Sequence, residues 1–315
     1  MPWAEENFPD QLRAIQEKFP DDIVTAPRLV GSRDLTDFPE RYQKGVFIDE
    51  WGCRFENVQD GTIGIVHKPF VETWSDLEKL KTPDKYLNLN TEEINRFCRN
   101  EKRFVLAGTW IRPFERLQFL RTTMNLLVDL VEQPPELHEL IRRMHQFFIK
   151  EAEAWARTDV DALTLMDDWG TQKASIISPW LWRTLFKPLY QDYVEVARKY
   201  KKYVFFHSDG YIVDIIPEFI EIGVDALNSQ IFCMGVEPLG EKFKGKITFW
   251  GEIDRQHILA YGSRNDVRNA VNDVYKNLYS DGGVIAQCEF GPGAKPENVE
   301  AVFQSWSEID KKMKG

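Results

Sequence analysis

The stretch Val204-Phe-Phe-His207-Ser-Asp209-Gly210 joins a short apolar run to a polar segment that ends in glycine. The same pattern recurs from about Phe104 onward, where apolar runs alternate with longer stretches of helical periodicity. Such alternation is typical of parallel βα units. The predicted strands cover residues 104–107, 162–166, 204–207, 226–228, 247–250 and 284–287.

The stretches between the predicted strands have the spacing of amphipathic helices. Within residues 135–156, apolar side chains recur at steps of three and four, from Leu137 and Leu140 to Phe148 and Ala152. With residues 22–26 as a first strand, the series favours an α/β fold, a (β/α)8 TIM barrel, over an open doubly wound sheet. The sequence has no Gly-x-Gly-x-x-Gly turn and no Gly-x-x-x-x-Gly-Lys-Ser/Thr loop, which argues against kinases and dehydrogenases.

Residues 41–83 do not show this alternation of predicted strands and helices. The segments Gly45-Val-Phe-Ile-Asp-Glu-Trp-Gly-Cys-Arg-Phe-Glu56 and Gly61-Thr-Ile-Gly-Ile-Val-His67 alternate over short distances, which predicts an inserted β-hairpin near the mouth of the barrel. No linker rich in proline and glycine divides the chain, so we expect residues 1–315 to form a single barrel domain.

The composition narrows the function classes. The chain has 315 residues, of which 43% are hydrophobic and 13% aromatic, and a net charge of −10. Its Lys and Arg are scattered, which argues against a nucleic-acid-binding surface. Neither a signal peptide nor an apolar run of membrane-spanning length occurs, so we expect a cytoplasmic protein without a membrane partner. The four cysteines form no Cys-x-x-Cys pair, which argues against a disulfide framework or a zinc knuckle.

Each predicted strand ends in a polar or glycine-rich cluster. The active sites of (β/α)8 barrels are built from side chains at such strand ends, so we expect these clusters to converge. The clusters are Gly108-Thr-Trp110, Asp167-Asp168-Trp169-Gly170, His207-Ser-Asp209-Gly210, Asn228-Ser-Gln230, Gly251-Glu252-Ile-Asp254 and Gln287-Cys288-Glu289.

Three of these side chains have the chemistry of a metal site. His207 and Asp209 lie on the same side of the strand if its geometry continues to Asp209. Together with the thiol of Cys288 they suit Zn²⁺, which takes imidazole, carboxylate and thiolate ligands. The alternative is a hydrogen-bonding histidine and an inert buried thiol. Cys233 is either a further ligand or a core cysteine.

The adjacent acids Asp167 and Asp168 should diverge, one into the barrel mouth and one into its wall. A carboxyl group in an apolar cleft can act as an acid, whereas one paired with arginine is structural. Glu252 and Asp254 are likewise either acids of the cleft or structural carboxylates, with the adjacent Arg255 as the arginine that would pair with them.

Aromatic and polar side chains at the strand ends supply a candidate substrate pocket. An aromatic-rich mouth suits a flat ring, although most of the aromatic residues belong to the core. The segment Asp49-Glu50-Trp51-Gly52 is either a solvated turn or a part of this pocket. The residues predicted to contact substrate are Trp110, Trp169, Asn228, Gln230 and Glu252.

The segment Asp167-Asp-Trp-Gly-Thr-Gln-Lys-Ala-Ser-Ile-Ile-Ser178-Pro179 closely resembles the uroporphyrinogen decarboxylase superfamily, which includes zinc-dependent, corrinoid-linked methyltransferases. The resemblance spans about two thirds of the chain and implies a (β/α)8 barrel. It continues through Trp182-Arg183, Lys187-Pro188, His207-Ser-Asp-Gly210, Gly223-Val-Asp-Ala-Leu-Asn228, Phe249-Trp-Gly-Glu-Ile-Asp254, Gly282-Gly283 and Pro296-Glu-Asn298.

Two branches of the superfamily differ in their site residues. True uroporphyrinogen decarboxylases carry an amino-terminal Met-Arg-Gln-Ala-Gly-Arg segment whose arginines hold the substrate's carboxylates, and this chain has no similar segment. The methyltransferase branch places a zinc-binding His-x-Cys pair where this chain has His207-Ser-Asp209, and a third cysteine where Cys288 stands. The resemblance thus implies zinc at His207, Asp209 and Cys288, with one thiolate replaced by carboxylate, which changes the metal's Lewis acidity.

The resemblance implies a methyltransferase that takes a methyl group from a small methoxylated, aromatic compound and gives it to the cobalt of a separate corrinoid protein. An alkyl ether oxygen is a poor leaving group, so zinc, or a neutral acid from Asp167, Asp168 or Glu289, polarises or protonates it. We expect the corrinoid protein to dock at the open end of the barrel, on a partly apolar face.

Two alternatives stay open. One is a metal-free decarboxylase of a carboxylated ring compound, which would use Asp49 or a carboxylate of the Asp167-Asp168 pair. The other is a non-catalytic protein that binds a corrinoid or another tetrapyrrole. Zinc content separates the first alternative from methyl transfer, and tight binding without turnover would mark the second.

Overall fold

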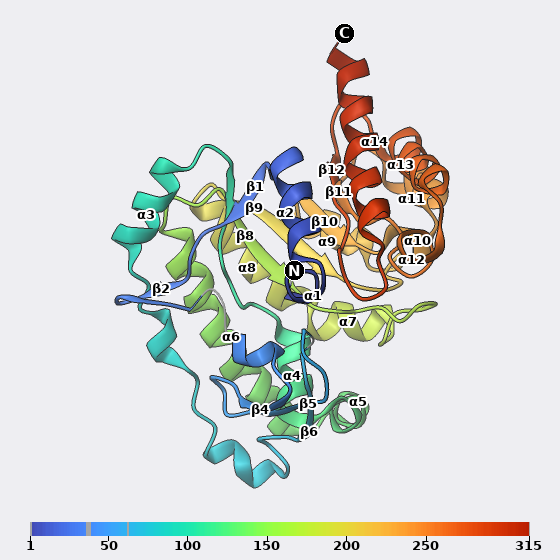
Figure 1. Cartoon of the computed structure of the whole chain (residues 1–315). Coiled ribbons are helices and arrows are strands. Elements are labelled where there is room, and N and C mark those ends of the chain that lie inside the picture. Colours follow the sequence, from blue (N-terminus) through green and yellow to red (C-terminus); the bar gives the residue numbers. More distant parts are fainter. Residues whose placement is uncertain (1, 36–38, 62, 315) are drawn as a thin grey trace. The chain divides into compact units, whose positions relative to one another are not determined.

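The computed structural model describes residues 2–35, 39–61 and 63–314 (Figure 1). The chain divides into two compact units. Unit 1 comprises Met1–Asp22, Asp168–Arg183 and Phe205–Gly315, and unit 2 comprises Ile23–Asp167 and Thr184–Val204.

Unit 2 contains three parallel strands that are neighbours in one sheet. They are β1 (Ile23–Thr25), β7 (Phe104–Leu106) and β8 (Ala162–Met166). The α-helices of this unit are α3 (Thr91–Asn100), α4 (Pro113–Arg121), α5 (Thr123–Glu132), α6 (Pro135–Ala156) and α8 (Lys187–Lys199). Helix α6 has the predicted bounds, begins at a proline, and buries its apolar stripe against β8 and α8.

The predicted insertion is also part of unit 2. It is a three-stranded antiparallel sheet of β4 (Gly45–Ile48), β5 (Arg54–Asn57) and β6 (Ile65–Lys68). Thr62, within the predicted hairpin, lies outside the described residues. A second, smaller hairpin joins β2 (Leu29–Val30) to β3 (Arg33–Asp34), and three 3-10 helices follow: η1 (Pro39–Tyr42), η2 (Trp74–Glu78) and η3 (Asp84–Leu87).

Aromatic packing and buried ion pairs attach the insertion to α4. The ring of Phe55 lies 4.9 Å from that of Phe119 on α4. Arg116, also on α4, is buried and forms ion pairs with both Asp49 and Glu50. The turn at Asp49 is therefore not a solvated acidic tip, because its carboxylates are held inside the unit.

Unit 1 contains four parallel strands that pair in chain order. They are β9 (Tyr203–Ser208), whose first residues belong to unit 2, β10 (Ala226–Ser229), β11 (Thr248–Gly251) and β12 (Val284–Ala286). Helix α7 (Pro179–Leu185) crosses from unit 1 to unit 2. The other helices are α1 (Pro2–Asn7), α2 (Pro9–Lys18), α9 (Ile216–Ile222), α10 (Ile231–Met234), α11 (Val236–Phe243), α12 (Ile258–Tyr261), α13 (Arg264–Leu278) and α14 (Pro296–Lys314).

Helices pack on the strands of unit 1 as the apolar pattern requires. The ring of Phe206 on β9 lies 4.3 Å from that of Phe219 on α9, which in turn lies 5.3 Å from that of Trp182. Figure 1 shows α13 between α11 and α14, and residues of α13 contact both helices. This packing fixes the strands whose carboxyl ends carry the polar clusters.

The α/β class and a TIM-barrel-like fold are confirmed, together with the antiparallel insertion. Within the described residues the main sheet has seven strands, one fewer than a complete (β/α)8 barrel. Neighbouring strands of the main sheet are parallel and alternate with helices along the chain. Each of the six predicted strands overlaps an observed one. Within the described ranges, no helix combines the length and the apolar character needed to cross a membrane.

Two glycines hold two strand-end loops of unit 1 together. The backbone N–H of Gly170 donates to the carbonyl of Asp209 at 3.1 Å. A Cβ built on Gly170 would come within 3.0 Å of backbone atoms of Gly210 and Tyr211, and one built on Gly210 would meet the backbone of Gly170. Gly210 also has φ of +80°, a left-handed conformation. The two loops approach this closely because neither glycine has a side chain.

We predict that Gly170→Ala and Gly210→Ala each lower the free energy of unfolding by at least about 2 kcal/mol, because backbone must move to make room. Gly245→Ala is the matched control: its φ is +75°, but the nearest atom to an added Cβ is 3.8 Å away. This control should cost only about 1 kcal/mol, the strain of a left-handed alanine. Urea denaturation of the variants measures all three values, and equal losses would contradict the steric argument.

Candidate metal centre

His207 lies near the carboxyl end of β9, after a run of buried apolar residues. In the parallel register its neighbour on β10 is Asn228, whose neighbour on β11 is Trp250. Residues in register on adjacent strands point to the same face of a sheet. The local sequence therefore places the imidazole and the amide side by side.

Hydrogen bonds fix the orientation and the tautomer of this imidazole. The side-chain nitrogen of Asn228 donates to the carbonyl of Trp250 at 2.6 Å and to Oε1 of Gln287 at 3.2 Å. Its Oδ1 therefore faces Nδ1 of His207, 2.5 Å away, and accepts the proton of that nitrogen. In the neutral ring Nε2 is then the bare nitrogen, the arrangement found in histidines that bind metal.

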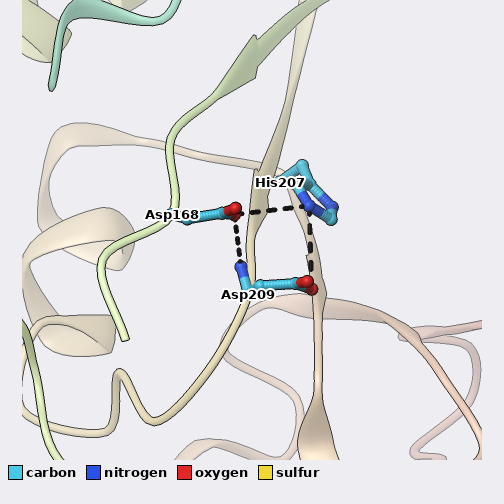
Figure 2. A group of neighbouring side chains, drawn as sticks. All are labelled: Asp168, His207 and Asp209. Carbon is cyan, nitrogen blue, oxygen red and sulfur yellow. Dashed lines mark hydrogen bonds and ion pairs between the residues drawn. The ribbon is translucent and has the colours of Figure 1, made fainter. Parts of the chain in front are cut away.

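Two carboxylates approach the bare nitrogen (Figure 2). His207 Nε2 lies 3.6 Å from Oδ1 of Asp168 and 3.7 Å from Oδ1 of Asp209. The backbone N–H of Asp209 donates to Oδ1 of Asp168 at 2.9 Å. One potential ligand atom from each of the three side chains lies within 4.8 Å of the others, so the group could hold a metal ion.

The chemistry of this group fits a divalent cation. Oδ1 of Asp209 is buried and accepts no hydrogen bond from the residues that the structure describes, although a buried carboxylate oxygen without a donor is costly. Oδ2 of the same carboxylate accepts a hydrogen bond from Arg255 at 2.5 Å, which turns Oδ1 toward His207. An imidazole nitrogen and two carboxylate oxygens form a ligand set that Zn²⁺ accepts, with a further position left for substrate.

Arg255 also contacts two further acids near this group. It forms an ion pair with Glu289, and its Nη1 lies 3.8 Å from Oε2 of Glu252. Burial raises the pKa of Glu252, and Arg255 opposes that shift. Glu289, a predicted catalytic acid, is thus held by a guanidinium, whereas Glu252 is buried beside the centre.

Cys288 is the predicted ligand that the structure does not bring into this group among the described residues. Its side chain is 3% exposed, and burial, with a smaller effect of Glu252, raises the pKa of its thiol. Zinc binds the thiolate, so this burial disfavours the ligand form. A role of Cys288 at the metal stays a prediction.

The adjacent acids diverge as the alternation predicted. Asp168 joins His207 and Asp209, whereas Asp167 is buried in unit 2 at the amino end of α4. There Asp167 accepts hydrogen bonds from the backbone N–H groups of Phe114 and Glu115 and from the hydroxyl of Tyr190. Burial raises the pKa of Asp167 and these hydrogen bonds lower it. Its contacts are those of a helix cap rather than of a catalytic acid.

The two predicted aromatic contacts lie in different environments. Trp169 is 1% exposed and packs edge-on against Trp182, with ring centroids 6.1 Å apart. Trp110 belongs to unit 2, where the guanidinium of Arg28 lies 3.7 Å from its ring centroid. Arg28 is itself buried in an ion pair with Glu151. These contacts give Trp169 a place in the core and Trp110 a structural cation–π partner.

A pocket of about 150 Å³ in unit 1 adjoins the metal centre. It shares Arg255 with the ion pair of Asp209, and Oε1 of its Gln230 accepts the backbone N–H of Gly210 at 3.2 Å. Cys233 lines the same pocket, where its thiol donates to the carbonyl of Gln230 at 3.1 Å. Of the predicted substrate contacts, Gln230 and Glu252 lie here, while Asn228 holds His207.

Sequence reasoning assigned Asp168 to catalysis and did not place it among the potential metal ligands, where its position beside His207 and Asp209 now puts it. It also missed the contact of Gly170 with Gly210 that brings the two acids together. The signal was present in the sequence, because Asp168 and Asp209 each stand within two residues of one of these glycines.

The fold is similar to those of solved proteins. A solved methyltransferase from Methanosarcina mazei superposes with a TM-score of 0.66 at 15% identity, covering 98% of this chain and 88% of its own. A B12-independent methionine synthase from Shewanella sp. W3-18-1, in complex with selenomethionine, gives a TM-score of 0.52 at 12% identity, covering 96% and 86%. At these identities the likeness concerns the fold alone. No curated protein matches the chain.

The sequence of the chain also matches a protein-family model. The family model of uroporphyrinogen decarboxylase (URO-D) matches residues 46–309, which include the parallel strands β7 to β12 and the metal centre. The resemblance read from the strand-end motifs is thereby confirmed, and the chain belongs to the uroporphyrinogen decarboxylase family.

Proposed function

We propose that this chain is a methyltransferase that moves a methyl group from a small methoxylated compound to the cobalt of a separate corrinoid protein, assisted by zinc. The observation that carries the proposal is the group of Asp168, His207 and Asp209. In it, Nε2 of His207 lies 3.7 Å from Oδ1 of Asp209, a buried oxygen that accepts no hydrogen bond within the described part of the chain. Membership of an enzyme family and a fold shared with a methyltransferase support it.

The reaction balances with the reduced corrinoid protein as co-substrate. The bond between the methyl carbon and the ether oxygen breaks while the carbon bonds to Co(I), which is oxidised to Co(III). The oxygen keeps the electron pair of the broken bond, takes one proton and leaves as a hydroxyl group. Zinc, when bound, supplies a Lewis acid that withdraws charge from this oxygen.

The protein's own residues prepare the centre for this chemistry. Asn228 holds the imidazole of His207 with Nε2 bare, and Arg255 turns one oxygen of Asp209 toward that nitrogen. Ligands oriented in advance lose little entropy when they bind the ion. Asp168, His207 and Asp209 would hold the ion, which would supply a Lewis acid for the ether oxygen of the methyl donor.

The size and charge of the adjoining pocket disfavour the reaction for which the family is named. Its volume of about 150 Å³ suits a single small ring rather than a tetrapyrrole. Glu252 and Asp254 line it, with Arg255 as the cationic side chain of the lining. A porphyrinogen with eight carboxylates requires several positioned cations. Methyl transfer from a small ether therefore fits this pocket better than decarboxylation of uroporphyrinogen.

We predict that the purified chain carries close to one zinc ion and that His207→Ala and Asp209→Asn each remove most of it, because each variant deletes a ligand. Plasma mass spectrometry of protein prepared without chelators measures the zinc. Glu237→Gln, an exposed carboxylate in unit 1, is the control and should keep its zinc.

Cys288→Ser separates the two ligand sets in the same experiment. Retention of zinc in this variant assigns the ion to Asp168, His207 and Asp209, as the structure leads us to expect. Loss of zinc would add the thiol to the ligand set. Absence of zinc from the wild-type protein under these conditions would contradict the proposal.

We predict that Asn228→Leu weakens zinc binding about tenfold to hundredfold without removing a ligand, because the imidazole loses the acceptor that fixes its tautomer. Competition with a chromogenic chelator measures the dissociation constant. Asn228→Asp keeps an oxygen opposite Nδ1 and should retain more affinity than Asn228→Leu. Identical affinities in the two variants would contradict the role of this hydrogen bond.

We predict that the zinc-loaded chain methylates a reduced corrinoid protein from at least one small methyl ether, and that His207→Ala slows this reaction at least about hundredfold. The absorbance change from Co(I) to the methylated cobalt follows the reaction. Failure with every methyl ether tested would count against methyl transfer. Release of carbon dioxide from a carboxylated ring by metal-free protein would instead support the decarboxylase alternative.

A further inference from the structure

The pocket beside the metal centre is lined mainly by residues with polar side chains, and their polar groups limit the methyl donor that it can take. Its lining belongs wholly to unit 1, and only Phe232 and Ile253 are apolar side chains without a hydrogen-bonding group. The polar lining residues are Gln172, Gln230, Cys233, Glu252, Asp254, Arg255, Gln256 and His257. Apolar atoms still form the larger part of the surface that these residues expose to the pocket, so the polar groups set the orientation of a ligand.

The amide side chains suit hydroxyl groups. Gln172, Gln230 and Gln256 each carry one acceptor oxygen and an NH2 group with two donors. A hydroxyl group also donates and accepts, so it pairs with an amide in either direction. A ligand with several hydroxyl groups can therefore satisfy this lining, whereas a ligand with none leaves the amides unpaired.

Glu252 is the strongest indication of a polar ligand. The residue is 5% exposed and lines the pocket, and its Oε2 has no hydrogen-bond partner among the described residues. The nearest cation, Arg255, is 3.8 Å from that oxygen and is shared with Asp209 and Glu289. A buried carboxyl oxygen without a partner is costly, and a ligand hydroxyl in the pocket would relieve that cost.

Charge limits the ligand further. Glu252 and Asp254 line the pocket, and Asp209 and Glu289 lie around the Arg255 side chain that they share. The carboxylate of a carboxylated methyl donor would be repelled by these acids, and the guanidinium of Arg255 would be its one counter-charge in the pocket lining. An uncharged donor does not pay this electrostatic penalty.

We propose that this pocket binds an uncharged methyl ether with several hydroxyl groups, a methylated monosaccharide or cyclic polyol, and that Glu252 Oε2 hydrogen-bonds to one of these hydroxyls. The proposal rests on the proposed function and names the class of its methyl donor. It replaces the aromatic donor expected from the sequence. The volume of about 150 Å³ accommodates a single six-membered ring.

The test measures binding without the corrinoid protein, so that it does not depend on turnover. Isothermal titration calorimetry of the full, zinc-loaded chain uses three probes: 3-O-methyl-D-glucose, methyl α-D-glucopyranoside and 3-O-methyl-D-chiro-inositol. Two comparison compounds lack the hydroxyl groups: 1,2-dimethoxybenzene and 3,4-dimethoxybenzoate. We expect at least one hydroxylated ether to bind at least tenfold more tightly than either comparison compound.

Variants of Glu252 connect this binding to the pocket. Glu252→Leu should weaken binding of the hydroxylated ether about tenfold to hundredfold, and Glu252→Gln, which keeps a hydrogen-bonding group, should weaken it less. Glu237→Gln is the matched control and should leave binding unchanged, because that carboxylate is exposed and outside the pocket. Zinc content and circular dichroism establish that each variant is folded, and Glu252→Gln serves if Glu252→Leu is not.

The outcomes separate this proposal from the one on which it rests. If no hydroxylated ether binds, or if 1,2-dimethoxybenzene binds more tightly, the donor class is overturned even when methyl transfer occurs. If a hydroxylated ether binds through Glu252 but never methylates a corrinoid protein, the pocket proposal stands and the methyltransferase proposal fails.

Discussion

The metal centre depends on the contact between the backbones of Gly170 and Gly210. The two loops approach so closely that neither position accepts a Cβ, and this approach sets Asp168 beside Asp209. Two carboxylates repel each other at such a distance unless donors compensate. The backbone N–H of Asp209 and the guanidinium of Arg255 are those donors. The absence of side chains at the two glycines thus allows the close approach of the loops, and this approach determines which charges lie beside each other in the site.

Most of the fold is readable from the sequence because its signals are local. The strands at residues 162–166 and 226–228 are short apolar runs bounded by polar or glycine residues, and each lies where predicted. Helix α6 shows its apolar stripe and its proline start in the sequence itself. The residues of β6 overlap the second predicted segment of the hairpin, but the sequence reasoning did not divide the first segment, residues 45–56, into the separate strands β4 and β5.

The site was predictable in position and only partly in its roles. Strand ends of parallel units meet at one edge, so the sequence could place His207 and Asp209 there. It could not divide the adjacent acids, because the N–H groups at the amino end of α4 that bind Asp167 come from a distant segment. The burial of Trp169 and of Cys288 likewise depends on packing partners far away in the chain. Alternation of side chains along a strand predicts that Asp167 and Asp168 point to opposite sides, and tertiary contacts determine where each carboxylate lies.

Arg255 gives the site a cation of its own. It binds Asp209 and Glu289 while the other oxygen of Asp209 stays turned toward His207. In zinc fingers, by contrast, the ion supplies the free energy of folding. Here hydrogen bonds and ion pairs hold the acids together without an ion, so their arrangement does not depend on a metal. A chelator should therefore leave the protein folded, with these acids in place.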